Sequence, residues 1–238
     1  MREEFKSALI CVYLRFHWNN KLTLAIFDLD NTLLRGDSDH AWGRFLIENH
    51  IVDGEEYERE NERYYAQYQA GTLDIMEFLA FALRPLALHD RATLDGWHRR
   101  YMQDKVLPMI TPAARALVNL HRANGDTLVI ITATNRFVTA PIAEEFEIPH
   151  LIATEPEERD GRFTGKVAGT PCYREGKVTR LKSWIKEQGL TMQDSWFYSD
   201  SHNDLPLLSI VDHPVAVNPD DILRREAQQR GWQILPLR

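Results

Sequence analysis

The sequence predicts an α/β fold built on a parallel sheet, and three observations support this prediction. Short apolar runs typical of buried strands recur along the chain and alternate with segments of helical periodicity. A long block after the first run, residues 38 to about 105, has helical periodicity throughout. Polar clusters follow several of the apolar runs directly. Because ligands of open α/β sheets bind at the carboxyl ends of the strands, these clusters mark the expected site.

The first expected strand is residues 22–27, a continuous apolar run between polar residues, as in a strand buried on both faces. In the block that follows, apolar and aromatic residues recur at helical spacing, and glycines and prolines punctuate them. We expect four or five helices and no strand there. Four tyrosines of this block are interpreted as helix packing: Tyr57, Tyr64, Tyr65 and Tyr68.

Strands and helices alternate again after Pro108. A helix is expected to begin at Thr111-Pro112, with proline in its first turn, and to end near Gly125. The elements expected after it are, in chain order, a strand at 127–132, a helix at 137–146, a short strand at 151–154, a hairpin at 157–169 turned by Asp160-Gly161, a helix at 175–188, strands at 196–198 and 215–217, and a helix at 220–229.

These elements predict a Rossmann-like parallel sheet core with an all-helical cap inserted after its first strand. The core is expected to comprise residues 21–36 and 107–238, and the cap residues 37–106. Residues 1–20 form an N-terminal extension to which we assign no function. Its apolar stretch, residues 8–14, is too short to span a bilayer and is followed at once by polar residues rather than by a cleavage site.

Composition narrows the functional class. Lysine and arginine number 28 against 35 aspartates and glutamates, a net charge of −7, which argues against broad binding of nucleic acid. The two cysteines, Cys11 and Cys172, lie far apart and form no CxxC pair, so neither a disulfide framework nor a zinc site is expected. The sequence therefore favours a protein of the reducing cytoplasm, with no membrane and no nucleic-acid partner.

Two carboxylates stand at the end of the first expected strand. Asp28 and Asp30 are separated by one residue, and alternate residues of a strand face the same side. Crowded carboxylates repel each other unless a cation or a proton intervenes, and Asp200 and Asp204 add negative charge if the sheet brings them near. Mg²⁺, which binds one or two carboxylates together with water and phosphate oxygens, is the natural cation for such a site.

A phosphate group beside that metal would find further partners. Thr132 can donate its hydroxyl, with the backbone N–H of Ala133 beside it, and Lys177 can supply positive charge. Lys166 is a rival for that role, but it lies in the expected hairpin, where a solvated lysine is ordinary. One aspartate can attack phosphorus to form an aspartyl-phosphate, and the other can protonate the leaving oxygen and later activate water.

The sequence resembles the haloacid dehalogenase superfamily of phosphohydrolases. Residues 28–32, DLDNT, match its first motif, DxDxT, and Thr132 ends the second expected strand as its second motif requires. Lys177 fits the third motif and residues 199–204, SDSHND, fit the fourth. The four motifs occur in the family's order over most of the chain. The helical cap and the hairpin before Lys177 resemble subfamily IB, the phosphoserine-phosphatase-like branch, whose cap is of the C1 type.

The resemblance implies a role for each matching residue. Asp28 would be the nucleophile and a magnesium ligand, and Asp30 would be the general acid and base and a ligand through its backbone carbonyl. Asp200 would be the third protein ligand. Asp204 would support the metal shell or orient the lysine, and Asn203 would contact the phosphate or the nucleophile.

The substrate expected from the resemblance is a small phosphorylated metabolite. In phosphoserine phosphatases an acid seven positions after the second aspartate binds the substrate amine, and here that position is Asp37. The arginine that holds the substrate carboxylate stands eleven positions after a cap glycine, but counting from Gly71 gives Ala82, and Arg84 is out of phase by about 200° of helix. An amine-bearing ester without a carboxylate therefore fits better than phosphoserine, and L-histidinol phosphate is the leading expectation.

Other functions share some of these features. Phosphoserine itself stays an alternative substrate, and the same intermediate serves phosphotransferases, in which an alcohol replaces water. A receiver domain has clustered acids, a threonine and a lysine, but it is shorter, has no cap and lacks DxDxT. A binding or regulatory protein with a vestigial site is the non-enzymatic alternative, and unchanged biology after Asp28→Asn would favour it.

Overall fold

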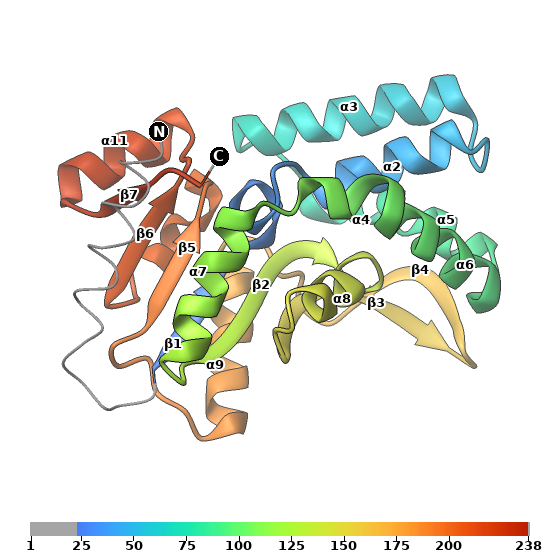
Figure 1. The fold of residues 1–238 in the computed structure, drawn as a ribbon. Coiled ribbons are helices and arrows are strands. Elements are labelled where there is room, and N and C mark those ends of the chain that lie inside the picture. The colour runs from blue at the N-terminus through green and yellow to red at the C-terminus, as the bar shows by residue number, and fades with distance from the viewer. Residues whose placement is uncertain (1–22, 238) are drawn as a thin grey trace.

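One seven-stranded sheet forms the centre of the molecule (Figure 1), here a computed structural model that describes residues 23–237. The strand order is β4-β3-β2-β1-β5-β6-β7, and every neighbouring pair is parallel except β3 and β4. The strands are β1 (Leu24–Phe27), β2 (Thr127–Asn135), β3 (His150–Arg159), β4 (Arg162–Ala168), β5 (Trp196–Ser199), β6 (His213–Val217) and β7 (Gln233–Leu235). This arrangement confirms the predicted α/β class with a mostly parallel sheet.

Helices cover both faces of this sheet. Successive residues of β1 point to opposite faces: Ala25 and Phe27 pack in one apolar cluster with α7 and α8, while Leu24 and Ile26 pack in another with α9, α10 and α11. The core helices are α7 (Pro112–Ala123), α8 (Arg136–Glu145), α9 (Glu175–Gln188), α10 (Leu205–Leu208) and α11 (Asp221–Arg230). Burial on both faces explains why these strands are apolar without alternation.

Five further helices lie between β1 and α7, as the sequence predicts, and we call them the cap. They are α2 (Ser38–Glu48), α3 (Gly54–Ala70), α4 (Ile75–Ala82), α5 (Arg84–Leu88) and α6 (Arg91–Tyr101). Figure 1 shows them beyond the end of the sheet at which β1 and β2 finish. An aspartate side chain accepts a backbone N–H at the start of four of these helices, at Asp37, Asp53, Asp74 and Asp90. The division at residues 37 and 106 stays a prediction.

Short turns of π or 3₁₀ helix join the regular elements. They are η1 (Leu29–Leu33), η2 (Met102–Val106), η3 (Leu107–Met109) and η4 (His202–Asp204). The first of them follows β1 directly and the last follows β5. Both therefore stand at the carboxyl ends of neighbouring central strands, where the sequence predicts the site.

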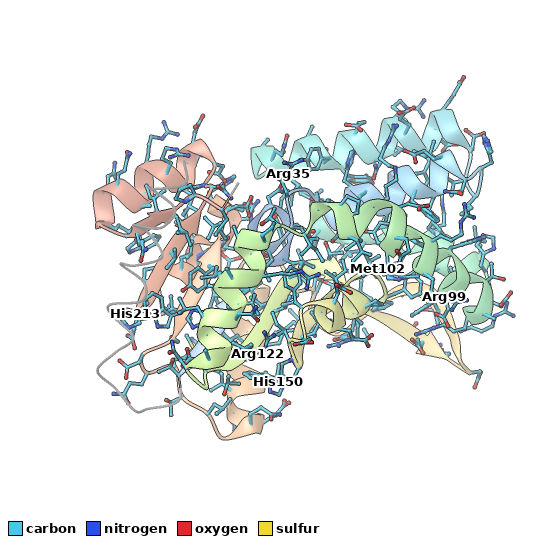
Figure 2. All side chains as sticks on the ribbon, in the orientation of Figure 1. Arg35, Arg99, Met102, Arg122, His150 and His213 are labelled. Atoms are coloured by element: carbon cyan, nitrogen blue, oxygen red, sulfur yellow. The ribbon has the colours of Figure 1, made fainter. Side chains whose placement is uncertain are left out.

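Cap and core share one apolar cluster. Trp42 of α2 stacks on Phe45 with 5.5 Å between ring centroids and meets Phe137 of α8 edge-on at 5.7 Å. A buried His98 of α6 is 2.9 Å from the carbonyl oxygen of Val138 in α8. Arg99 and Met102, both labelled in Figure 2, line a groove between the cap and the β3–β4 hairpin. The cap is thus tied to the core by packing as well as by the chain.

Some elements extend beyond their predicted bounds. β2 continues to Asn135 rather than ending at Thr132, but its regular pairing with β3 breaks after Ile131. β3 runs through the predicted hairpin start to Arg159, because its outer half pairs with β4 instead of with β2. Two short elements, α10 and β7, are absent from the sequence-based expectations, and each spans only a few residues.

The remaining expectations concern cysteine and the N-terminus. Cys172 is buried and carries a free thiol. Cys11 and the predicted extension 1–20 lie outside the described residues. Within residues 23–237, no helix has the length and apolar character that crossing a membrane requires.

Candidate active site

Asp28 and Asp30 leave the sheet together at the end of β1. The backbone N–H of Asp28 still donates to the carbonyl oxygen of Tyr198 at 2.9 Å, so the pairing with β5 fixes its place. The chain then turns through η1, where Asn31 adopts the left-handed region at φ 56°. Both carboxylates are buried, with 3% of Asp28 and 8% of Asp30 exposed. The rigid strand end holds the first aspartate, and the turn brings the second beside it.

Lys177 is the buried cation at the site. Its Nζ donates to Asp28 Oδ1 at 2.8 Å and to the Asp204 carboxylate at 2.8 Å. The Ser199 hydroxyl also donates to Asp204, at 2.7 Å. Although burial alone lowers the pKa of the ammonium, Asp204 and Asp28 raise it above the usual range, so the lysine is charged. The rival lysine, Lys166, lies exposed on β4.

Burial disfavours the ionised form of Asp28, the candidate nucleophile. Desolvation raises the pKa of Asp28 to about 7, because Lys177 only partly offsets the burial and the nearby charge of Asp204. Desolvation likewise raises the pKa of Asp200 well above its usual value, and the charges of Asp28 and Asp204 raise it further. The carboxylates of Asp28, Asp200 and Asp204 therefore lie close enough for their charges to interact, and Lys177 offsets only part of that negative charge.

The donor set at this point suits a hard divalent cation. The Thr32 hydroxyl lies 3.3 Å from Asp28 Oδ2 and 3.2 Å from Asp200 Oδ1, so one small group bridges the two carboxylates. Among the described residues, no three side chains of histidine, cysteine, aspartate or glutamate converge on one point. The predicted set needs only two carboxylates and the Asp30 carbonyl, with water and phosphate oxygens completing the shell, so it fits Mg²⁺.

Asp30 is held by donors from both the core and the cap. The Thr134 hydroxyl donates to its Oδ2 at 2.8 Å, and the backbone N–H of Ser38 donates to its Oδ1 at 2.6 Å. Desolvation, followed by the charge of Asp37, raises the pKa of Asp30 to about 7. A raised pKa favours the protonated form of Asp30, which is the form that a general acid requires.

A pocket connects this acidic pair to the cap. Its empty space is about 550 Å³, counting the part open to solvent, which is the scale of a small-molecule site. No lysine or arginine is among the described residues that line it. The lining residues are Asp28, Asp30, Asp37, Asp39, His40, Asn61, Tyr64, Tyr65, Tyr68, Leu73, Ile75, Phe78, Thr132, Ala133, Thr134 and Tyr173.

The structure gathers most of the predicted site residues in or beneath this pocket. Thr132 and Ala133 line it, and Thr132 Oγ1 accepts from the backbone N–H of Thr134 at 3.2 Å, which leaves its own hydroxyl hydrogen for a ligand. Asp37 lines it too, while its side chain accepts from the His40 backbone N–H at 2.8 Å. Their roles toward a substrate stay predictions.

Asn203 engages the cap. Its Oδ1 accepts from the Tyr173 hydroxyl at 3.1 Å and from Arg174 at 3.0 Å, and its Nδ2 donates to the carbonyl oxygen of Tyr68 at 3.2 Å. Arg174 also donates to the carbonyl oxygen of Gly71. These bonds join the start of α9 and η4 to the last turn of α3, and they occupy the amide that the resemblance assigns to phosphate or nucleophile.

Several pocket residues are absent from the sequence-based prediction. Tyr64, Tyr65 and Tyr68 do pack on neighbouring rings, as interpreted, but they also form a wall of the pocket. Thr134 and Asp39 were not singled out. A signal for Thr134 existed, because the strand ends in the polar run TATN, residues 132–135, immediately after the second motif.

Comparisons with known proteins agree with this geometry. The sequence matches the family model of haloacid dehalogenase-like hydrolases over residues 25–209. It is 49% identical over 216 residues to a histidinol-phosphatase of Neisseria meningitidis serogroup C (strain 8013), and the match covers 89% of this chain and 97% of that protein.

Solved structures have the same fold. A Bordetella pertussis Tohama I protein with unknown function superimposes with a TM-score of 0.87 at 45% identity, over 92% of this chain and 100% of that chain. A substrate-bound phosphoserine phosphatase superimposes with a TM-score of 0.68 at 18% identity, over 90% of this chain and 93% of that chain. The second likeness concerns the fold alone.

Proposed function

The chain belongs to the haloacid dehalogenase-like hydrolase family and is a phosphatase, and from this premise we propose that it hydrolyses an amine-bearing phosphate monoester, L-histidinol phosphate. One observation carries the choice of substrate. The pocket beside Asp28 and Asp30 contains the acids Asp37 and Asp39 and aromatic rings, but neither lysine nor arginine among its described lining residues. Such a lining favours a cationic substrate group and offers a carboxylate no partner.

The two cap positions considered for binding a substrate carboxylate support this choice. Ala82, which stands where the resemblance expects an arginine, is buried in α4, with 5% of its surface exposed. Arg84 is exposed on α5 and does not line the pocket. The Neisseria relative carries the name histidinol-phosphatase, which agrees with an amino alcohol phosphate as substrate.

The reaction proposed for this site has two steps. A carboxylate oxygen of Asp28 attacks phosphorus, the bond from phosphorus to the substrate oxygen breaks, and Asp30 gives its proton to that oxygen. Asp30 then takes a proton from water, whose oxygen attacks phosphorus and releases phosphate from Asp28. Lys177, Thr132 and the Ala133 N–H stabilise the negative charge of the transferring group.

Mg²⁺ is the proposed cofactor. Asp28, Asp200 and the backbone carbonyl of Asp30 would hold it, and Asp204 would keep Lys177 in place beside it. When bound, the ion offsets the repulsion between an anionic nucleophile and an anionic phosphate. Removal of divalent cations with EDTA is expected to stop phosphate release, and added Mg²⁺ to restore it.

The test is phosphate release from L-histidinol phosphate and L-phosphoserine in parallel, with Mg²⁺. We expect a clear preference for the histidinol ester, and no release by Asp28→Asn, a variant of almost unchanged shape. Melting temperatures of both proteins control for folding. A preference for phosphoserine would contradict the substrate assignment, and activity in pure Asp28→Asn would contradict the proposed nucleophile.

A further inference from the structure

Asp39 lies on the first turn of α2 and lines the cap side of the pocket. Its Oδ2 atom is buried and has no hydrogen-bond partner among the residues that the structure describes. A buried carboxyl oxygen without a hydrogen-bond partner lowers the stability of the folded protein, because it has lost its hydration and gained no bond in return. A ligand that donates a hydrogen bond to this oxygen would remove that cost.

Asp37 and Asp39 differ in the hydrogen bonds that their side chains accept within the protein. The Asp37 side chain caps α2 through the His40 N–H at 2.8 Å. Asp37 directly precedes Ser38, whose backbone N–H donates to Asp30 Oδ1 at 2.6 Å, so Asp37 is the acid of this pair that the chain ties to Asp30. Asp39 Oδ2, in contrast, accepts no hydrogen bond from the described residues.

The pocket that Asp39 lines also has aromatic walls. Tyr64, Tyr65 and Phe78 line the same pocket, and the Tyr64 and Phe78 rings meet edge-on with 5.4 Å between centroids. Tyr65 stacks on His40 at 4.6 Å. Aromatic walls pack on the faces of a planar group, and an acid that lines the same pocket can accept a hydrogen bond from an N–H on the edge of that group.

We propose that Asp39 is a specificity-determining residue that accepts a hydrogen bond from a ring N–H of the substrate, while Asp37 binds the amine nearer the phosphate. The inference rests on the proposed function and deepens it. The substrate class is a phosphorylated amino alcohol whose side chain is a nitrogen heterocycle with an N–H donor. An aromatic ring without that donor would fill the same space but leave Asp39 unpaired.

The decisive experiment compares L-histidinol phosphate with L-phenylalaninol phosphate, which keeps the amine, the ester and an aromatic ring but lacks the ring N–H. Wild type should favour the histidinol ester by at least about tenfold in kcat/KM. Asp39→Leu should abolish this preference by raising KM for the histidinol ester alone, with kcat nearly unchanged. Asp39→Asn, which keeps an acceptor oxygen, should lie between the two. Glu55→Leu, which removes an exposed acid of α3, should change neither substrate.

Binding gives the same comparison without turnover. Calorimetric titration with the free alcohols, L-histidinol and L-phenylalaninol, should show a preference in wild type that Asp39→Leu loses. Equal losses for both ligands, or no change for either, would overturn the role of Asp39 and leave the proposed function standing. A wild-type protein that hydrolyses neither ester and binds neither alcohol would overturn both. Removing a carboxyl group with an unpaired buried oxygen should not lower the melting temperature of Asp39→Leu.

Discussion

At the residue scale, Lys177 joins two buried carboxylates of the candidate site. Lys177 contacts both Asp28 and Asp204 at 2.8 Å, and all three side chains are almost entirely buried. The lysine therefore has a structural task besides the one proposed toward phosphate. The two tasks can be separated, because one affects the free energy of unfolding and the other the rate.

We predict that Lys177→Met lowers the free energy of unfolding by about 3 kcal/mol in the absence of Mg²⁺ and removes phosphatase activity, because two buried carboxylates lose their partner. Urea unfolding at pH 7 measures the first effect. Lys166→Met removes the same group from the exposed face of β4 and should change neither quantity. A Lys177→Met protein as stable as wild type would show that the carboxylates do not depend on the lysine.

At the same scale, site residues that belong to short motifs could be predicted from the sequence, whereas Thr134, whose contact depends on packing, was not predicted. Asp28, Asp30, Thr132 and Lys177 occur in recognisable spacing, and the structure brings them together. Thr134 Oγ1 reaches Asp30 only because β2 continues past its expected end. The run at residues 132–135 marks this end of the strand, but only the structure shows that the strand continues through it with irregular pairing to β3.

Among the elements, the last turn of α3 is where the cap meets η4, the short turn after β5 that contains His202. Gly71 ends this helix at φ +69°, and a Cβ built there would lie 2.5 Å from His202 Nε2. His202 cannot move aside freely, because Asp220 holds its Nδ1 at 2.8 Å. Glycine is thus required both by the backbone conformation and by the close approach.

Gly71→Ala should destabilise the protein more than Gly189→Ala, its matched control. Gly189 ends α9 at φ +66° but has open space around a built Cβ, so it carries only the left-handed cost of about 1 kcal/mol. The additional contact should also displace α3 and raise KM, because Tyr68 lines the pocket. Urea unfolding and steady-state kinetics on both variants measure this difference, and equal effects would contradict the close contact.

Helix α6 brings a pH-dependent side chain to the boundary between cap and core. Burial lowers the pKa of His98 from the usual 6.5, and the hydrogen bond to Val138 offsets this only in part. Below pH 6.5 the unfolded chain binds a proton that the folded protein resists, so this residue's contribution to stability is complete above pH 6.5 and declines as the pH falls.

We therefore predict that wild type loses stability relative to His98→Gln as the pH falls from 7.5 to 5.5, by at most about 1.4 kcal/mol per pH unit. Taking the difference between the two proteins removes the opposing contributions of the buried aspartates, which both share. Urea unfolding at the two pH values gives the result. A difference in stability that is independent of pH would mean that His98 titrates normally in the folded state.

For the whole molecule, the shared apolar cluster predicts cooperative unfolding. Trp42, Leu94 and Tyr101 of the cap belong to the same buried cluster as Phe27 and Val138 of the core. Neither part can open fully without exposing apolar surface of the other. Calorimetry should show one transition whose calorimetric and van't Hoff enthalpies agree, and two resolved peaks would show instead that the cap unfolds by itself.

For the whole molecule, the sequence predicts the sheet but not the pocket. Alternation of strands and helices foretold the sheet, because each element carries its own periodicity. The pocket could not be foretold, because its walls come from β2, α2, α3, α4 and the segment before α9, and only the packing of the cap on the core brings them together. Asp39 has no signature in its neighbours along the chain.

The origin of the pocket walls separates two kinds of evolutionary change. The groups proposed to break the phosphate ester come from the ends of sheet strands and from α9, whereas the groups proposed to select the alcohol come from the inserted helices. Mutations at insertion residues that do not contact Asp30 can therefore change which alcohol is bound while the strand-end groups stay in place. Duplicated copies of such a gene can then diverge toward new metabolites while each ancestor along the way remains a working enzyme.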